Sequence, residues 1–241
     1  MAGSMTRLPK SFRLDRPVHA VFGSIYEVRT EEPIVHLTYD DGPHPEVTPA
    51  VLDVLDEFGI EATFFMLTRQ AERHPDLVGE VCRRGHAIAL HTRTHRPLPE
   101  LGWRQLIDEV ITARKDLEAI AGVPVRWFRP PYGADGWRGV PITRVGKMTS
   151  VAWTADTHDW KGLTGEDPLR NARKNLRPGA IVLMHDVPAT GSRQEDESRG
   201  LVTKEALTRL LVDEIERRGL QPVSLDRLLR AGPPVKRVRL R

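Results

Sequence analysis

The sequence predicts a single α/β domain in which parallel strands, joined by helices, form a TIM-like barrel. Short apolar runs alternate with amphipathic stretches over most of the 241 residues, which is typical of strands connected by crossover helices. Polar residues capable of chemistry follow one apolar run after another. In a parallel barrel those strand ends converge on one face.

Seven short apolar runs are predicted to be strands, and five amphipathic stretches are predicted to be helices. The strands are Ile34–Tyr39, Ala62–Met66, Ala87–Leu90, Trp127–Arg129, Ser150–Thr154, Ile181–Met184 and Pro222–Val223. The helices are Val47–Phe58, Pro75–Arg84, Trp103–Ala121, Pro168–Asn175 and Thr203–Arg218. The ambiguous segment Trp137–Val145 is predicted to be a loop with a short helix. Glycine follows four of these stretches, where a left-handed residue is favoured: Gly59, Gly85, Gly122 and Gly219.

Composition disfavours several classes of function. The 36 Lys and Arg against 33 Asp and Glu leave a net charge of only +3, without an aromatic-rich basic stripe, so we expect no nucleic-acid partner. No apolar run approaches the ~20 residues that span a bilayer. The single cysteine, Cys82, excludes an intrachain disulfide. We expect a monomer. The first residues lack a signal-peptide core, which predicts a cytoplasmic protein as the sequence is written, or an extracytoplasmic one if a leader was removed.

Two adjacent carboxylates, Asp40 and Asp41, end the first predicted strand. Neighbouring side chains in an extended segment point in opposite directions, so one carboxylate can ligate a metal while the other approaches from another side. A simple Asp-Asp-Gly-Pro turn is the alternative interpretation. The apolar run Ile34–Tyr39 favours a site, because it places the pair at the carboxyl end of a strand.

His91 and His95 follow the third predicted strand with a spacing of four residues. This spacing places both imidazoles on one face of a helix, or on one side of a turn entering a helix. With Asp41 they form an Asp-His-His set, which suits one divalent metal: Zn²⁺ fits best, with Co²⁺, Ni²⁺ and Mn²⁺ as alternatives. Asp40 is then left over to act on bound water, which is what hydrolysis at neutral pH requires.

Further polar groups follow the later strands. The guanidinium of Arg129, before two stiffening prolines, is suited to gripping Asp40, although an exposed arginine before a turn is the alternative. Asp159 and His185 follow neighbouring strands, and an Asp–His pair would raise the imidazole pKa so that it can donate a proton. Three apolar residues either wall a small pocket or belong to the core: Trp160, Val182 and Leu183.

Together these strings resemble the polysaccharide deacetylases of the NodB-homology type, carbohydrate esterase family 4. The family is marked by five ordered motifs, TFDDGP, H-S/T-x-x-H, R-x-P-Y, D-x-x-D-W and L-x-x-H. This chain has Thr38–Pro43, His91–His95, Arg129–Tyr132, Asp156–Trp160 and Val182–His185 in that order. The resemblance covers Pro33 to Leu229. Tyr39 replaces the Phe of the first motif, and Val182 replaces the Leu of the fifth, which would slightly enlarge the acetyl pocket.

The resemblance implies a distorted (β/α) barrel of about seven parallel strands and metal-dependent removal of an acyl group from an acetylated carbohydrate. The ligands of one divalent metal would be Asp41, His91 and His95. Asp40 would be the general base with Arg129 as its partner, and His185 the general acid with Asp159 tuning it. The backbone N–H of Tyr132 would help to hold the oxyanion, while Trp160 and Val182 would shape the pocket for the acetyl methyl group.

The resemblance also divides the chain into three parts. Residues 1–32 would be an extension that packs on or leads into the barrel, residues 33–230 the catalytic domain, and residues 231–241 a basic tail. We expect the basic end of this tail, Lys236–Arg241, to be solvated and frayed, with a polyanion-binding arm as the alternative. Substrate selection is expected from four loops above the barrel: Arg96–Trp103, Ala134–Val145, Asp156–Asp167 and Pro188–Gly200.

The expected activity is hydrolysis of a non-peptide C–N bond, namely removal of N-acetyl groups from amino sugars of a chitin-like or peptidoglycan-like glycan. An amine leaves poorly without a proton donor, so the presence of both Asp159 and His185 favours amide over ester substrates. An O-acetyl esterase acting on xylan is the alternative enzyme. A sugar-binding protein on a catalytically dead scaffold is disfavoured, because every predicted catalytic position has a competent residue.

Overall fold

The computed structural model describes residues 23–164 and 167–238. Residues 1–22 of the predicted extension and residues 239–241 of the predicted tail lie outside the described residues, so the division into three parts stays a prediction. The described strands are β1 (Ser24–Val28), β2 (Ile34–Asp40), β3 (Thr63–Met66), β4 (Ala87–Leu90), β5 (Trp127–Phe128), β6 (Thr149–Ser150), β7 (Ala155–Asp156), β8 (Ile181–His185), β9 (Gln221–Pro222) and β10 (Pro234–Arg237).

The described α-helices are α2 (Val47–Glu57), α3 (Thr68–Arg73), α4 (Pro75–Arg83), α5 (Trp103–Leu106), α6 (Ala113–Ala121), α7 (Gly136–Val145), α8 (Arg193–Ser198), α9 (Lys204–Arg217) and α10 (Leu225–Arg230). A π-helical stretch, Ile107–Thr112, joins α5 to α6. Short 3₁₀ turns occur at Leu98–Glu100, Pro131–Gly133, Asp159–Lys161 and Ala172–Lys174.

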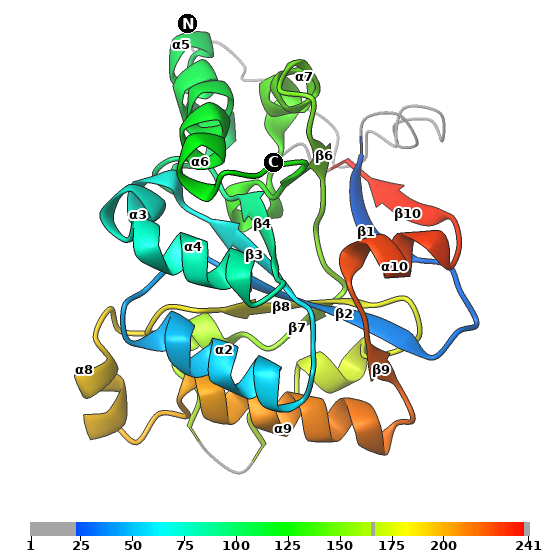
Figure 1. The fold of residues 1–241 in the computed structure, drawn as a ribbon. Coiled ribbons are helices and arrows are strands. Elements are labelled where there is room, and N and C mark those ends of the chain that lie inside the picture. The colour runs from blue at the N-terminus through cyan, green and yellow to red at the C-terminus, as the bar shows by residue number, and fades with distance from the viewer. Residues whose placement is uncertain (1–22, 165–166, 239–241) are drawn as a thin grey trace, which may run out of the picture.

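One curled parallel sheet organises the molecule (Figure 1). Its strand order is β6-β5-β4-β3-β2-β8-β7, and β9 pairs with β2. Each of these neighbouring pairs is parallel. Helices α2 and α9 pack together on the outside of the sheet (Figure 1). The prediction of a distorted (β/α) barrel of about seven parallel strands is therefore confirmed.

Alternation along the strands separates an outer from an inner face. Leu37 and Tyr39 of β2 point outward into the large core shared with the helices, as do Val182 and Met184 of β8. Phe65, Ala89, Val151 and Ile181 belong to a smaller apolar cluster on the inner side. The positions of β2 that alternate with Leu37 and Tyr39 are polar and buried: His36, Thr38 and Asp40. Strand β2 therefore carries its polar groups toward the inside of the barrel.

The barrel is closed by irregular pairing instead of a continuous strand. Strands β6 and β7 lie at opposite edges of the sheet, so the chain between them crosses the opening. There Ala152 N–H donates to the carbonyl of Ile25 in β1, at 2.7 Å. For this reason the predicted strand Ser150–Thr154 is wrong as a single strand: its start pairs with β5, and the chain joins β8 only from the N–H of Thr154 onward.

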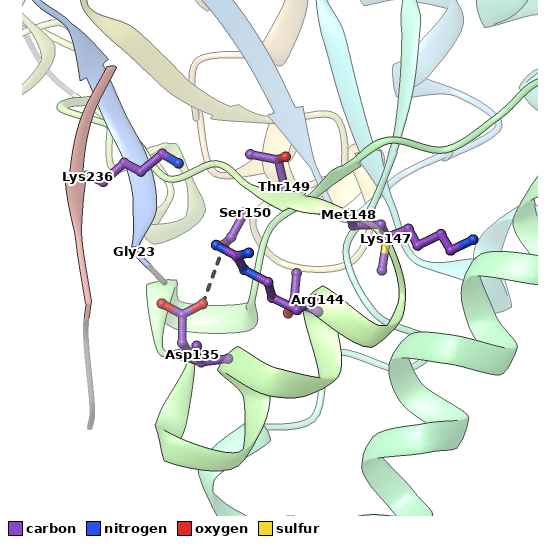
Figure 2. A pocket seen from close by; sticks show the side chains of 10 residues that line it. Gly23, Asp135, Arg144, Lys147, Met148, Thr149, Ser150 and Lys236 are labelled. Atoms are coloured by element: carbon purple, nitrogen blue, oxygen red, sulfur yellow. Dashed lines mark hydrogen bonds between the residues drawn. The ribbon is translucent and has the colours of Figure 1, made fainter. Parts of the chain in front are cut away.

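Strand β1 is anchored beside α7 by buried polar contacts. The Ser24 hydroxyl donates to Asp135 Oδ2 at 3.0 Å and lies 2.7 Å from Ser150 Oγ. Asp135 and Ser150 line a cavity of about 320 Å³ between β1, β6 and α7, shown in Figure 2. On its other edge, β1 pairs with β10. The expectation of a frayed basic end is thus wrong for Lys236 and Arg237, because they belong to the antiparallel strand β10.

Several other local predictions met different outcomes. The four glycines predicted to end helices all have positive φ, from 64° to 84°, as expected. The predicted helix Pro168–Asn175 is wrong beyond a 3₁₀ turn, because turns bury its apolar residues equally well. The segment predicted as a loop with a short helix is the ten-residue α7, despite its glycines and Pro141, which weaken helices.

No helix within residues 23–164 and 167–238 is long and apolar enough to cross a membrane.

His36 should make stability depend on pH. Its Nδ1 lies 2.7 Å from the carbonyl oxygen of Val223, which only accepts, so Nε2 is left to accept from the Thr63 hydroxyl at 2.9 Å. Burial lowers the pKa of His36 to about 4. Below the ordinary histidine pKa of about 6.5, His36 is therefore protonated in the unfolded chain but stays neutral in the folded protein. Stability is present above that pH and is lost as the pH falls toward 4.

We expect this difference to remove about 2 kcal/mol of unfolding free energy between pH 7 and pH 5. Urea unfolding of the wild type and of His36→Gln at both pH values measures it, and the variant should lose less stability on acidification. The variant His74→Gln, which leaves His36 in place, should keep the wild-type slope. Equal slopes for the wild type and His36→Gln would contradict this role.

Candidate active site

A cavity of about 370 Å³ opens at the carboxyl ends of the parallel strands. Its lining combines carboxylates and imidazoles with aromatic side chains: Asp40, Asp41, His91, His95, Tyr132, Trp153, Asp156, Trp160, Leu183 and His185. Polar side chains from β2, β4, β7 and β8, or from the loops that follow them, therefore meet in one place, as the sequence predicts.

Asp41, His91 and His95 converge with ligand atoms that all lie within 4.8 Å of one another. Asp41 Oδ1 lies 3.5 Å from His91 Nε2 and 3.4 Å from His95 Nε2. His91 Nδ1 lies 2.7 Å from the carbonyl oxygen of Arg129 and must donate to it. Burial lowers the pKa of His91 to about 3. The ring is therefore neutral at pH 7, and its unprotonated Nε2 carries a lone pair.

This donor set fits a cation. The lone pair of His91 Nε2 faces Asp41 Oδ1, and that oxygen is buried without a hydrogen-bond partner. Two facing acceptors repel each other, and a buried unpaired carboxylate oxygen is costly. One oxygen and two nitrogens around a common point are the ligands that Zn²⁺ and related divalent ions prefer.

Left-handed backbone brings both neighbouring carboxylates into the cavity. Asp41 has a φ of 79°, which breaks the extended alternation directly after β2. The prediction that Asp40 and Asp41 point in opposite directions is therefore wrong. Among the described residues, most non-glycine positions with positive φ lie in loops around this cavity: Asp41, Thr92, His95, Tyr132 and His158. Such backbone strain concentrates at functional sites.

The two histidines are held by a turn and not by a helix. The N–H of His95 donates to Thr92 Oγ1 at 3.1 Å. Buried Glu109, in the π-helical stretch, accepts from the N–H groups of Arg93 and Thr94 at 3.0 and 2.9 Å. π-Helical segments are frequent at functional sites. No sequence signal marked Glu109, because a glutamate on an amphipathic helix usually faces solvent.

Asp40 forms the predicted ion pair with Arg129. Arg129 Nη1 donates to Asp40 Oδ1 at 2.6 Å, and both side chains are buried. Arg129 also donates to Thr38 Oγ1 and to the carbonyls of Val151 and Ala152. Burial raises the pKa of Asp40, while the positive charge of Arg129 opposes that rise. Asp40 is thus fixed in place and suited to accept a proton.

The second predicted pair, Asp159 with His185, is extended by a lysine. Asp159 Oδ1 lies 2.8 Å from His185 Nδ1, which leaves His185 Nε2 on the side of the cavity. Burial disfavours the imidazolium, but the Asp159 charge outweighs burial and raises the pKa of His185 to about 9. Lys204 Nζ donates to Asp159 Oδ2 at 2.6 Å and is itself buried. Burial would raise the pKa of Asp159, yet His185 and Lys204 hold it well below its usual range.

The sequence did not predict a role for Lys204, because it begins α9, where a lysine is normally solvated.

The sequence also did not predict a role for Asp186. Its Oδ1 accepts from the N–H of Gly42 at 3.0 Å, its Oδ2 accepts from Thr48 Oγ1 at 2.7 Å, and burial raises its pKa to about 7. A Cβ at Gly42 would meet Asp186 Oδ2 at 2.1 Å. Glycine is therefore required directly after the metal-ligand candidate Asp41.

The apolar wall of the cavity differs from the prediction at one position. Tyr132, Trp160 and Leu183 line the cavity as expected, but Val182 does not. Val182 points outward into the helix-covered core, because adjacent residues of a strand face opposite sides. Its predicted role in the acetyl pocket is wrong. Trp153, which the sequence did not single out, lies on the cavity side instead.

Comparison with known proteins places this arrangement in a family. Residues 27–142 match the family model for polysaccharide deacetylase. A chitooligosaccharide deacetylase of Azorhizobium caulinodans is 35% identical over 210 residues, which are 85% of this chain and 99% of that protein. The chain belongs to the polysaccharide deacetylase family. A peptidoglycan-N-acetylglucosamine deacetylase of Bacillus cereus is 32% identical over 207 residues, covering 85% of this chain and 92% of that protein.

Solved structures agree with this assignment. The Bc1960 peptidoglycan N-acetylglucosamine deacetylase aligns with a TM-score of 0.76 and 28% identity, over 86% of this chain and 92% of that chain. A family 4 pseudoenzyme from Bacillus anthracis aligns with a TM-score of 0.74 and 26% identity, over 86% of this chain and 69% of that chain. Deacetylases of this family depend on a metal, and the Asp41–His91–His95 cluster is a fitting place for it in this chain.

Proposed function

We propose that this protein is a Zn²⁺-dependent hydrolase that removes N-acetyl groups from N-acetylglucosamine units of a chitin-like or peptidoglycan-like glycan. The observation that supports this most strongly is one cavity lined by Asp41, His91 and His95 together with Asp40 and His185. The relatives named chitooligosaccharide and peptidoglycan N-acetylglucosamine deacetylases support the same substrate class.

Asp41, His91 and His95 would hold the metal. When bound, the metal lowers the pKa of a coordinated water and polarises the acyl carbonyl. Asp40 accepts the proton of the attacking water, and Arg129 keeps its carboxylate oriented. The backbone N–H of Tyr132 is the proposed donor to the oxyanion. Leu183 and Trp160 receive the acetyl methyl group on the apolar side of the cavity.

His185 supplies the proton to the departing amine. Its Nδ1 is engaged by Asp159, so the proton on Nε2 is the one available inside the cavity. With a pKa of about 9 the imidazole is charged at neutral pH. An amine is a poor leaving group unless it is protonated as the C–N bond breaks. A fully formed Asp159–His185 pair is therefore better matched to an amide than to an ester.

An O-acetyl esterase on the same scaffold is the second candidate, since an ester also fits the small apolar wall. Acetate release from acetylated chito-oligosaccharides and from acetylated xylan fragments separates the two. We expect release from the N-acetylated substrates, its loss after chelation, and its return when Zn²⁺ is added. Release from xylan fragments alone would overturn the proposed substrate. A dead sugar-binding scaffold is disfavoured, because Asp40, Arg129, Asp159 and His185 are all present and paired.

Lys204 should matter for the acid step. In Lys204→Met, Asp159 Oδ2 keeps the N–H of His185 but loses the Lys204 ammonium, so Asp159 and the imidazole that it holds are oriented less well. We expect acetate release from N-acetylated oligosaccharides to fall roughly 10-fold to 100-fold, because general acid catalysis contributes about 10²- to 10⁴-fold and a poorly oriented acid loses only part of that. Turnover of an aryl acetate, whose leaving group needs no proton, should change far less.

The ratio of the two activities, measured with Lys204→Met and Lys204→Arg, provides the check. Lys204→Arg keeps the positive charge and should restore part of the loss, and the exposed control Lys174→Met should behave as wild type. A parallel loss on amide and aryl ester would show that Lys204 only supports the fold.

A further inference from the structure

Exposed aromatic rings are concentrated on the catalytic face. Among the described residues, four large aromatic side chains are more than 45% exposed: Trp103, Tyr132, Trp137 and Trp160. All four lie in segments that follow β4, β5 or β7, and such segments form the catalytic face of a parallel barrel. Exposed aliphatic residues are spread more widely over the described chain. Ile107 lies one turn after Trp103, whereas Val123 precedes β5, Val145 ends α7, and Leu210 lies within α9.

Tyr132 and Trp160 belong to the catalytic cavity, but Trp103 and Trp137 do not line it. Trp103 begins α5, eight residues after His95, and Trp137 lies in the first turn of α7, five residues after Tyr132. Their rings meet edge to face, with centroids 6.1 Å apart and planes at 89°. Together Trp103 and Trp137 form an aromatic corner that is 49% and 64% exposed.

Contacts between the two loops hold the aromatic corner in place. Arg138 Nη1 donates to the carbonyl of Leu101 at 3.1 Å, and its guanidinium lies 4.6 Å from the centre of the Trp137 ring. Gly136 has a φ of 61°, and a Cβ there would lie 3.1 Å from the side chain of Pro99. The loops after β4 and β5 are therefore held side by side. At their origin, the rings of His95 and Tyr132 are also in contact, with centroids 4.8 Å apart.

We propose that Trp103 and Trp137 form a sugar-binding subsite, which stacks a pyranose unit of the glycan outside the cavity that holds the unit being deacetylated. This rests on the proposed function. A pyranose presents an apolar C–H face and a polar rim, and tryptophan offers a flat apolar face with a polar N–H. Rigid aromatic side chains also lose little conformational entropy on binding. A docking surface for another protein would be expected to include several exposed aliphatic residues, whereas Ile107 alone of those exposed in the described chain lies one turn from Trp103.

The subsite predicts that chain length matters. For chito-oligosaccharides from dimer to hexamer, kcat/KM of the wild type should rise with length. Trp137→Ala and Trp103→Ala should each raise KM for the hexamer about tenfold, as loss of one aromatic stack does elsewhere, with kcat little changed. The variants should deacetylate the chito-oligosaccharide dimer at the wild-type rate. Trp137→Phe should keep most of the effect, and the exposed control Leu210→Ala should match the wild type.

Direct binding separates this subsite from the activity. Calorimetric titration of hexamer into Asp40→Asn should give a Kd that weakens about tenfold when Trp137→Ala is added. Unchanged hexamer binding and KM, or an equal loss on dimer and hexamer, would overturn the subsite. The subsite would also be overturned if the wild-type protein formed a homodimer in solution, and if the tryptophan variants made it monomeric without changing the dependence of kcat/KM on oligosaccharide length. If the wild type releases no acetate from any length, the proposed function fails, while the titration still tests the corner.

Discussion

Asp40→Asn should lower acetate release by about 10³-fold, because a positioned general base contributes on the order of 10²- to 10⁴-fold. The substitution keeps the shape of the side chain but removes the group that accepts the proton. Asp40 is not one of the three clustered ligand candidates, so metal binding should persist. Binding of an N-acetylated oligosaccharide should persist as well, since the apolar wall is unchanged.

The check on Asp40 combines initial rates with titrations of metal and oligosaccharide. The Asp40→Asn substitution leaves Arg129 without an anionic partner, so the variant will be less stable and should be assayed well below its midpoint of thermal unfolding. Arg129 still has the carbonyls of Val151 and Ala152 to donate to and lies over the Phe65 ring, which keeps it satisfied. An Asp40→Asn protein that is folded, binds metal and still turns over at more than a tenth of the wild-type rate would contradict its role as the base.

Arg129→Met should cause the largest loss of stability of any substitution at this site. Arg129 is completely buried, and its removal leaves the buried carboxylate of Asp40 unpaired. Breaking a buried ion pair from one side costs about 3–5 kcal/mol. The carbonyls of Val151 and Ala152 and the hydroxyl of Thr38 also lose a donor, which adds to the cost.

A double-mutant cycle isolates the charge from the lost contacts. In Asp40→Asn combined with Arg129→Met, neither charge of this pair is left buried, so urea unfolding should show the double variant to be more stable than Arg129→Met alone. Arg126→Met, at an exposed arginine paired with Asp226, should cost less than about 1 kcal/mol. If Arg129→Met unfolded at the same urea concentration as that control, the buried pair would not organise the site.

The sequence predicted the site better than the details of the fold, and the reason is physical. Each functional residue follows an apolar run, and strand ends of a parallel barrel must converge, so the approximate positions of Asp40, His91 and His185 are set by topology alone. Which way a side chain faces depends on single φ angles. The left-handed φ of Asp41 turns its carboxylate into the cavity, and the sequence pattern contains no signal for that angle.

The functional residues that the sequence did not predict are those that position other residues through hydrogen bonds. Lys204, Asp186 and Glu109 are distant in sequence from the groups that they hold, and each resembles an ordinary surface charge on a helix or loop. Val182 shows the opposite error. Its place in a motif suggested a pocket wall, whereas strand alternation places Leu183 on the cavity side and Val182 in the core.

The central claim is that one divalent ion, held by Asp41, His91 and His95, makes this cavity a deacetylation site. The most direct measurement is a stepwise addition of Zn²⁺ to metal-free protein, with bound metal and acetate release from a chito-oligosaccharide followed in the same samples. We expect release to rise in proportion to bound Zn²⁺ and to stop rising at one ion per chain, with both signals lost in His91→Ala and His95→Ala. Full release from metal-free protein, or undiminished Zn²⁺ binding by these variants, would contradict the account.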